Sequence, residues 1–179
     1  MEFSILYAIP HTAVLDSCIL GLDKMVGSIG QLFLITGILL TIFKKTRRTG
    51  IAVLISYFGV LLFGQLILKH LISRARPCQI DLNFPLLLER PTSSSFPSTH
   101  AAWAFGTATA IFLKYRKVGI ACFVFAALIA FSRLYLFMHF PTDVLFGVIM
   151  GVVLGIASEK LCDKYYKRKD ETSPEKENR

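Results

Sequence analysis

Long apolar runs, separated by short charged segments, dominate the chain. A membrane-spanning helix needs about 20 mostly apolar residues, and somewhat fewer when its polar ends reach the interface. Five stretches approach this requirement: residues 28–43, 50–72, 99–113, 118–137 and 142–162. The third stretch is the shortest. The pattern predicts an all-α fold, a polytopic transmembrane helix bundle with about five spans over residues 28–162.

The two ends of the chain differ from this central domain. Residues 1–27 mix apolar groups with Pro10, Asp16 and Asp23, a pattern that favours a kinked helix lying in the membrane interface. A sixth span is the alternative for this segment. Residues 163–179 form a basic, polar tail rich in Lys and Glu, and we predict that this tail is cytoplasmic and disordered.

The composition agrees with a membrane protein. Hydrophobic residues make up 54% of the 179 residues and the mean hydropathy is +0.56, which excludes an ordinary soluble domain. A net charge of +8 does not indicate a nucleic-acid partner, because the cations lie in short clusters between apolar runs. The four cysteines lack the spacing of a zinc or redox site. The sequence does not indicate an oligomeric state.

Clusters of Lys and Arg predict the orientation of the bundle, because cytoplasmic loops are enriched in these residues. With five spans, three clusters fall on one side of the membrane: residues 44–48, 114–117 and 164–169. That side is therefore expected to be the cytoplasm of a multi-pass cell-membrane protein. The loop 73–98 and the short connection 138–141 then lie at the extracytoplasmic face.

Lys69 and Arg76, the latter followed by Pro77, lie where the second predicted span ends. Basic residues at a helix end commonly anchor the helix among lipid headgroups, and that structural role alone could explain them. These cations, however, lie on the side where the positive-inside rule predicts few. They are therefore also candidates for binding an anion.

Pro97, Ser98, Thr99 and His100 open the third predicted span. A proline followed by a hydroxyl residue is an ordinary helix start, so capping alone explains Ser98. His100 is different, since it lies in the first turn, where unpaired N–H groups and the positive end of the helix dipole favour an anion. A structural histidine at the interface is the alternative.

Arg133 lies inside the fourth apolar stretch, where an unpaired charge is costly and commonly marks a functional site or an ion pair. His139 and Asp143 follow, four residues apart around the start of the fifth stretch. At that spacing the carboxylate can hold one imidazole nitrogen and leave the other free to attack an electrophile. An inert Asp–His pair is the alternative.

The predicted topology brings these three groups to one level of the outer face, because successive spans alternate in direction. Three cations, two histidines and one carboxylate would meet there: Lys69, Arg76, Arg133, His100, His139 and Asp143. Such a cluster would be costly to desolvate unless an anion completed it. A phosphate group fits this role, since arginine offers a fork that matches phosphate oxygens and lysine adds a point charge.

The three segments resemble the signature of a known family, the type 2 phosphatidic acid phosphatases: KxxxxxxRP, PSGH and SRxxxxxHxxxD. Residues 69–77 match the first part and residues 132–143 the third part in full. Residues 97–100 match the second part except at Thr99, where the family has glycine. If that position contributes only a backbone N–H at a helix start, threonine can serve, because helical φ is negative.

The resemblance implies a role for each matching residue. His139 matches the nucleophile that forms a phosphohistidine, Asp143 the residue that orients and activates it, and His100 the acid that protonates the leaving oxygen. Residues that match the phosphate-binding positions, or lie among them, are Lys69, Arg76, Ser98, Thr99 and Arg133. The resemblance implies no metal and no cofactor. The residues agree, since three cations can stabilise phosphoryl transfer and the chain shows no convincing carboxylate cluster for Mg²⁺.

The resemblance also implies a membrane lipid phosphate as substrate, hydrolysed at the surface of the lipid bilayer. A small, outward-facing member looks most like a bacterial undecaprenyl pyrophosphate phosphatase, which would serve cell wall biogenesis. A phosphatidylglycerol phosphate or phosphatidic acid phosphatase is the alternative. From another class, a lipid-phosphate transporter would need the cations but not the His139–Asp143 pair with a separate His100. A vanadate-dependent haloperoxidase shares the anion pocket but is generally soluble.

Overall fold

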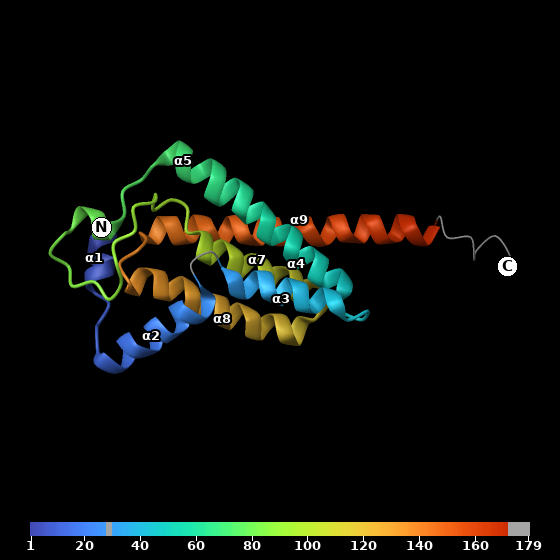
Figure 1. The fold of residues 1–179 in the computed structure, drawn as a ribbon, viewed down its shortest axis with the longest axis horizontal. Helices are drawn as coiled ribbons and strands as arrows, with labels where there is room; N and C mark the ends of the chain where they lie inside the picture. Colours follow the sequence, from blue (N-terminus) through green and yellow to red (C-terminus); the bar gives the residue numbers. More distant parts are fainter. Residues whose placement is uncertain (28–29, 172–179) are drawn as a thin grey trace.

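In the computed structural model the described residues are 1–27 and 30–171, and every regular element within these ranges is a helix (Figure 1). The helices are α1 (Glu2–Tyr7), α2 (Ala13–Val26), α3 (Gln31–Ile42), α4 (Arg47–Gly59), η1 (Val60–Leu68), α5 (Lys69–Ile72), α6 (Pro77–Ile80), α7 (Thr99–Lys114), α8 (Arg116–Tyr135) and α9 (Pro141–Glu171). η1 is a π-helix that joins α4 to α5 without a break. The predicted all-α fold is confirmed.

Three segments are long and apolar enough to cross a membrane: Arg47–Ile80, Arg116–Tyr135 and Pro141–Lys169. α2 and α3, bent by 51° with respect to each other, would supply a fourth if the pair forms one broken span. α7 has 16 residues and α3 has 12, fewer than the roughly 20 of a straight crossing. Exposed apolar side chains on α4, α8 and α9 include Phe58, Leu128 and Ile149, as a lipid-facing surface requires.

α7 lies at the centre of the bundle and contacts α3, α4, α8 and α9 (Figure 1). Its buried positions include several alanines, which leave room for close neighbours on every side. On α9, Gly147, Gly151 and Gly155 face α7 at four-residue spacing. A Cβ added to Gly151 would clash with a carbonyl oxygen of α7, and one added to Gly147 with the carbonyl oxygen of its N-cap residue, Ser98. Small residues at this spacing allow transmembrane helices to pack backbone against backbone. The starts of α7 and α9 are thereby held together.

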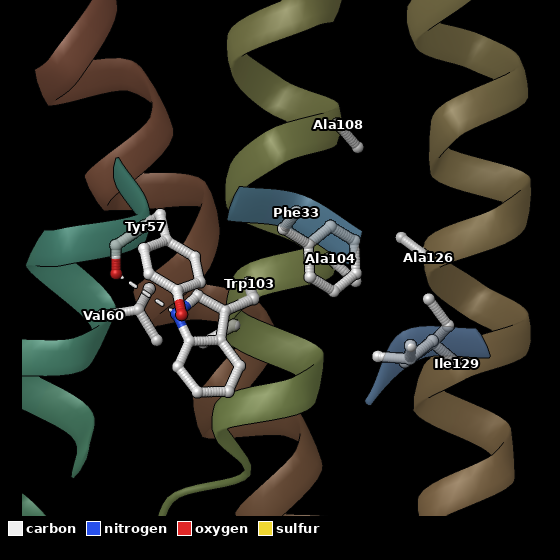
Figure 2. Packing of buried hydrophobic residues seen from close by; sticks show 10 residues of the cluster. Phe33, Tyr57, Val60, Trp103, Ala104, Ala108, Ala126 and Ile129 are labelled. Carbon is white, nitrogen blue, oxygen red and sulfur yellow. Dashed lines mark hydrogen bonds between the residues drawn. The ribbon is translucent and has the colours of Figure 1, made fainter. Parts of the chain in front are cut away.

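Trp103 is the largest side chain of the main apolar core (Figure 2). Its ring stacks on Tyr57 with 5.3 Å between ring centroids, and its indole N–H donates a hydrogen bond to the Tyr57 carbonyl at 3.1 Å. Phe33 from α3 and Ile129 from α8 complete the core around it. Because the indole N–H has a partner, this large aromatic group can be buried without leaving a polar atom unsatisfied. The core fixes α4 against α7.

The N-terminal segment forms two helices, α1 and α2, rather than one kinked helix. Pro10 lies in the break between them, where its missing N–H interrupts no helical hydrogen bond. Thr12 then caps α2, since its hydroxyl accepts a hydrogen bond from the Leu15 N–H at 3.3 Å. Residues 28 and 29, where the first span was predicted to begin, lie outside the described residues.

The prediction that the tail is disordered from residue 163 is wrong for its first part, because α9 continues to Glu171. Contacts with α4 explain the extra helical turns. Arg48 forms an ion pair with Asp163, and its guanidinium lies 5.8 Å from the ring centroid of Tyr166. Residues 172–179 of the predicted tail lie outside the described residues.

The loop 81–98, named the outer loop for its predicted side of the membrane, lies at one end of the bundle with α1, α6, the end of α8 and the start of α9 (Figure 1). The connections from α3 to α4 and from α7 to α8 lie at the opposite end (Figure 1). The three sequence motifs therefore meet at one end of the molecule, on helices that are held close by small residues.

Candidate active site

A cavity of about 290 Å³ lies where the three motifs meet. Among its lining residues are Lys69, Arg76, Thr99, His100, Arg133 and His139, all predicted from the sequence. Asp143 and Ser98 do not line it, although both are fully buried directly behind it. The Ser98 N–H donates a hydrogen bond to the Asp143 carbonyl at 3.1 Å, which ties α7 to α9 at the base of the site.

His139 lies in the tight connection between α8 and α9 and is 2% exposed. Its Nδ1 lies 2.7 Å from the carbonyl oxygen of Ser95, which can only accept, so Nδ1 holds the proton and donates it. Nε2 then bears the lone pair and lies 3.3 Å from Nη1 of Arg76. Burial, followed by the nearby charges of Arg76 and Lys69, holds the pKa of His139 well below its ordinary value. The imidazole is therefore neutral at physiological pH.

Asp143 is 0% exposed and its carboxylate is held by three donors. Oδ2 accepts hydrogen bonds from the Ser95 hydroxyl at 2.5 Å and the Phe140 N–H at 2.9 Å, while Oδ1 accepts one from Nη1 of Arg74 at 2.6 Å. Oδ2 lies 4.0 Å from Nδ1 of His139. In this geometry Nδ1–H of the imidazole donates its direct hydrogen bond to the Ser95 carbonyl, and Asp143 reaches His139 mainly through Ser95.

Arg76 fixes the outer loop over the cavity. Its Nε donates to the Ser93 carbonyl at 2.9 Å and Nη2 to the Ser93 hydroxyl at 3.0 Å, while Nη1 donates to the Met138 carbonyl at 3.0 Å. One guanidinium thus connects the loop 81–98 to the connection that contains His139. Ser93 also lines the cavity, so the same contact places a hydroxyl beside it.

Lys69 and Arg133 differ in how their charges are balanced. Lys69 is 9% exposed, and its ammonium group makes no hydrogen bond or ion pair with any other residue that the structure describes. Arg133 is 4% exposed and pairs with Asp23 of α2, with 2.7 Å between Nη2 and Oδ1. It also donates to the Ser132 hydroxyl from Nε and Nη2. An anion entering the cavity would find Lys69 unpaired and Arg133 shared with Asp23.

The second motif forms the start of α7. Ser98 takes the N-cap position, but its buried hydroxyl makes no capping hydrogen bond and has no partner among the described residues. Thr99, which replaces the glycine of the signature, is 2% exposed and helical. His100 places Nε2 3.1 Å from the Gly27 carbonyl and its ring edge against Trp103. Only Nδ1 of His100 is then available to a ligand.

Several residues of the site are not specified by the sequence motifs, although Arg74 lies at an open position of the first one: Glu2, Asp23, Arg74, Ser93 and Ser95. Each contacts a motif residue only because distant parts of the chain fold over the ends of the helices. The run Ser93–Ser94–Ser95 in the outer loop is a sequence signal for Ser93 and Ser95, because it places a cluster of hydroxyl groups beside the second motif. Among the described residues, no three His, Cys, Asp or Glu side chains come together as a metal site would require.

Comparison with known proteins identifies the family to which the chain belongs. A model of the PAP2 superfamily matches residues 49–165, which include all three motifs. The chain belongs to the PAP2 superfamily. An undecaprenyl-diphosphatase of Sulfolobus acidocaldarius is 32% identical over 124 residues, which make up 69% of this chain and 60% of the relative. An undecaprenyl-diphosphatase of Bacillus subtilis is 27% identical over 60% of this chain and 57% of the relative.

Two solved structures have the same fold. The phosphatidylglycerolphosphate phosphatase of Bacillus subtilis, described as a transmembrane PAP2 type, aligns with a TM-score of 0.65 and 27% identity over 86% of this chain and 79% of that one. LpxE of Aquifex aeolicus aligns with a TM-score of 0.69 and 28% identity over 88% of this chain and 92% of that one. The all-helical, multi-pass PAP2 membrane fold is thus established, while the chain spans about three fifths of the curated relatives described above.

Proposed function

We propose that the chain is an integral membrane phosphatase that hydrolyses a phosphate ester or diphosphate of a membrane lipid through a phosphohistidine. One observation supports this most strongly. A neutral, buried His139 holds its proton on Nδ1 and turns the lone pair of Nε2 toward a cavity lined by Lys69, Arg76 and Arg133. A binding site for phosphate needs the cations alone, whereas a site for phosphoryl transfer also needs a nucleophile oriented in this way.

In the first step Nε2 of His139 attacks phosphorus, the N–P bond forms, and the bond from phosphorus to the leaving oxygen breaks. The electron pair of that bond goes to the leaving oxygen, which takes a proton from Nδ1 of His100. The negative charge of the bound phosphate allows this buried imidazole to hold that second proton. His139 becomes cationic, with Nδ1–H still donated to the Ser95 carbonyl and Asp143 behind it. In the second step the unprotonated Nδ1 of His100 takes a proton from a water whose oxygen attacks phosphorus. The N–P bond breaks, its electron pair returns to Nε2 of His139, and inorganic phosphate leaves with His139 neutral and His100 protonated again.

Stabilisation of the transferring phosphoryl group falls to the residues that line or flank the cavity. Charge spreads over the three non-bridging oxygens during transfer, and fixed cations stabilise it without having to reorganise. Lys69, Arg76 and Arg133 supply those charges. The first backbone N–H groups of α7, beginning at Thr99, add donors at the positive end of a helix, and Ser98 offers its unpartnered hydroxyl.

The substrate that we propose is undecaprenyl pyrophosphate, cleaved to undecaprenyl phosphate. Both sequence relatives described above are named undecaprenyl-diphosphatases. Phosphatidylglycerol phosphate is the second candidate, because a solved relative with the same fold is named as its phosphatase. We further propose that α3 and α7 complete about five crossings and that the site opens at the extracytoplasmic face, opposite the clusters at 44–48 and 114–117.

The test compares phosphate release from undecaprenyl pyrophosphate, phosphatidylglycerol phosphate and phosphatidic acid in identical mixed micelles containing EDTA. We expect release in EDTA, with undecaprenyl pyrophosphate hydrolysed fastest. Faster hydrolysis of phosphatidylglycerol phosphate would make that lipid, and not undecaprenyl pyrophosphate, the proposed substrate. Tight binding without release would support a transporter, and an absolute requirement for Mg²⁺ would contradict the pocket described here.

A further inference from the structure

Arg74, which occupies a position that the first motif leaves unspecified, connects both groups that approach Nδ1 of His139. Its side chain donates to Oδ1 of Asp143 from Nη1 at 2.6 Å. Its backbone carbonyl accepts a hydrogen bond from the Ser95 N–H at 2.8 Å, and Ser95 in turn provides the carbonyl that holds Nδ1. One residue therefore fixes the hydrogen-bond acceptor of the imidazole and the carboxylate behind it.

Arg74 is itself held from the opposite side by the N-terminal helix. Nη2 pairs with Oε2 of Glu2 at 2.5 Å, and the guanidinium lies over the ring of Phe140 with 4.2 Å from Cζ to the centroid. Glu2 also accepts hydrogen bonds at Oε1 from the hydroxyl and N–H of Thr142, at 2.6 and 3.3 Å, in the first turn of α9. α1 and the start of α9 lie side by side in Figure 1.

The ionisation of Glu2 supports this arrangement. Burial raises the pKa of its carboxyl group, but the hydrogen bonds from Thr142 and Arg74 outweigh burial and leave the pKa below its ordinary value. Glu2 is therefore negatively charged at neutral pH. Together Glu2, Arg74 and Asp143 have one net negative charge, whereas Arg74 and Asp143 alone would have none.

We propose that Arg74 is a positioning residue for His139, and that Glu2 clamps Arg74 so that the trio keeps a net negative charge behind the imidazole. This inference rests on the proposed phosphohistidine mechanism. When Nε2 forms its bond to phosphorus, the ring gains a positive charge, and a net negative group behind Nδ1 stabilises that charge. Neither Arg74 nor Glu2 lines the cavity that contains His139, although Arg74 lines an adjoining cavity of about 450 Å³ that shares Lys69 and Ser93. Both residues reach His139 through Asp143 and Ser95.

Three variants test the proposal in the full-length protein: Arg74→Ala, Arg74→Lys and Glu2→Gln. Arg74→Ala should lower kcat by about 10- to 100-fold, the range expected when a reacting group loses its alignment, with KM within about threefold of wild type. Arg74→Lys should recover part of that loss. Glu2→Gln should lower kcat by about two- to fivefold, because a partly exposed ion pair contributes modestly. A rapid-quench measurement should place each loss in the formation of the acid-labile phosphoenzyme.

Arg116→Ala is the matched control, since this arginine lies over the ring of Phe112 at 5.5 Å on the opposite end of the bundle and should leave kcat unchanged. A folded Arg74→Ala protein with kcat within twofold of wild type would overturn the proposal. So would an Arg74→Lys protein as slow as Arg74→Ala. If Arg74→Ala does not fold, Glu2→Gln decides, and an unchanged rate of phosphoenzyme formation would refute the clamp. A wild-type protein that releases no lipid phosphate would instead refute the proposed function.

Discussion

His139 owes its properties to its surroundings more than to its position in a motif. The Ser95 carbonyl holds Nδ1 in its protonated form, and burial among cations keeps the ring neutral. The low pKa also means that acid protonates the free ring only well below the range usual for histidine. In the proposed mechanism, protonation of His139 therefore does not limit the free enzyme near neutral pH.

His139→Ala should abolish turnover, with a loss of about a thousandfold or more, because no other group can form the covalent intermediate. Phosphate release from labelled lipid phosphate and trapping of the acid-labile phosphoenzyme measure the two steps. His70→Ala is the control, since His70 is exposed and bonded through Nδ1 to the Leu66 carbonyl. Residual turnover above a few per cent in His139→Ala would contradict its assignment as nucleophile.

Substitution of Thr99 by glycine tests whether this departure from the family signature affects catalysis or only stability. Its side chain is 2% exposed, beside Gly64 of η1, and its backbone is helical. Thr99→Gly should therefore retain kcat within about threefold, while the lost packing and the freer backbone lower stability by about 1 kcal/mol or more. Kinetics and thermal unfolding in detergent separate the two effects. A rise of tenfold or more in kcat would show that threonine restricts the pocket.

The sequence indicates the residues that line the cavity far better than the residues that hold them. Lys69, Arg76 and His139 lie in motifs at the ends of apolar runs, where charge is unusual enough to be noticed. Ser95 and Asp23 have no such signal. Ser95 acts through a backbone carbonyl, which every residue possesses, and Asp23 meets Arg133 only because α2 folds against α8.

At the scale of elements, the contact between α7 and α9 sets the geometry of the site. A Cβ on Gly151 would clash with the carbonyl of Ala102, so Gly151→Ala must push the helices apart. We expect a loss of stability of about 1–3 kcal/mol, typical of overpacking, together with slower turnover. Thermal unfolding and kcat measure both effects. Gly21→Ala on α2, where an added Cβ meets nothing within 4 Å, should be neutral or slightly stabilising.

The hydropathy pattern predicts the positions of these helices more accurately than it predicts where they end. The predicted stretches 99–113 and 118–137 correspond to Thr99–Lys114 and Arg116–Tyr135. α9 exceeds its predicted end because Asp163 pairs with Arg48 of another helix, a contact that apolar periodicity cannot indicate. The π-helical stretch η1, which precedes Lys69, likewise cannot be predicted from the apolar pattern.

For the whole molecule, the cation clusters give an orientation that labelling can test. Leu82 is exposed in the outer loop and Lys45 in the connection between α3 and α4. In intact cells, a membrane-impermeant maleimide should label Leu82→Cys but not Lys45→Cys in a background without the four native cysteines. Lysis should expose Lys45→Cys. Labelling in the reverse order would place the site on the cytoplasmic side.

The glycines of α9 also bear on how the bilayer influences this protein. We expect the helix that presents His100 and the connection that presents His139 to move as one unit, because Gly147 and Gly151 let α9 touch the backbone at the start of α7. A thicker or thinner bilayer can tilt or raise that unit, at a modest cost per ångström of mismatch, without changing the separation of the two rings. Membrane thickness would then determine which headgroups reach the cavity, and leave the chemical step untouched.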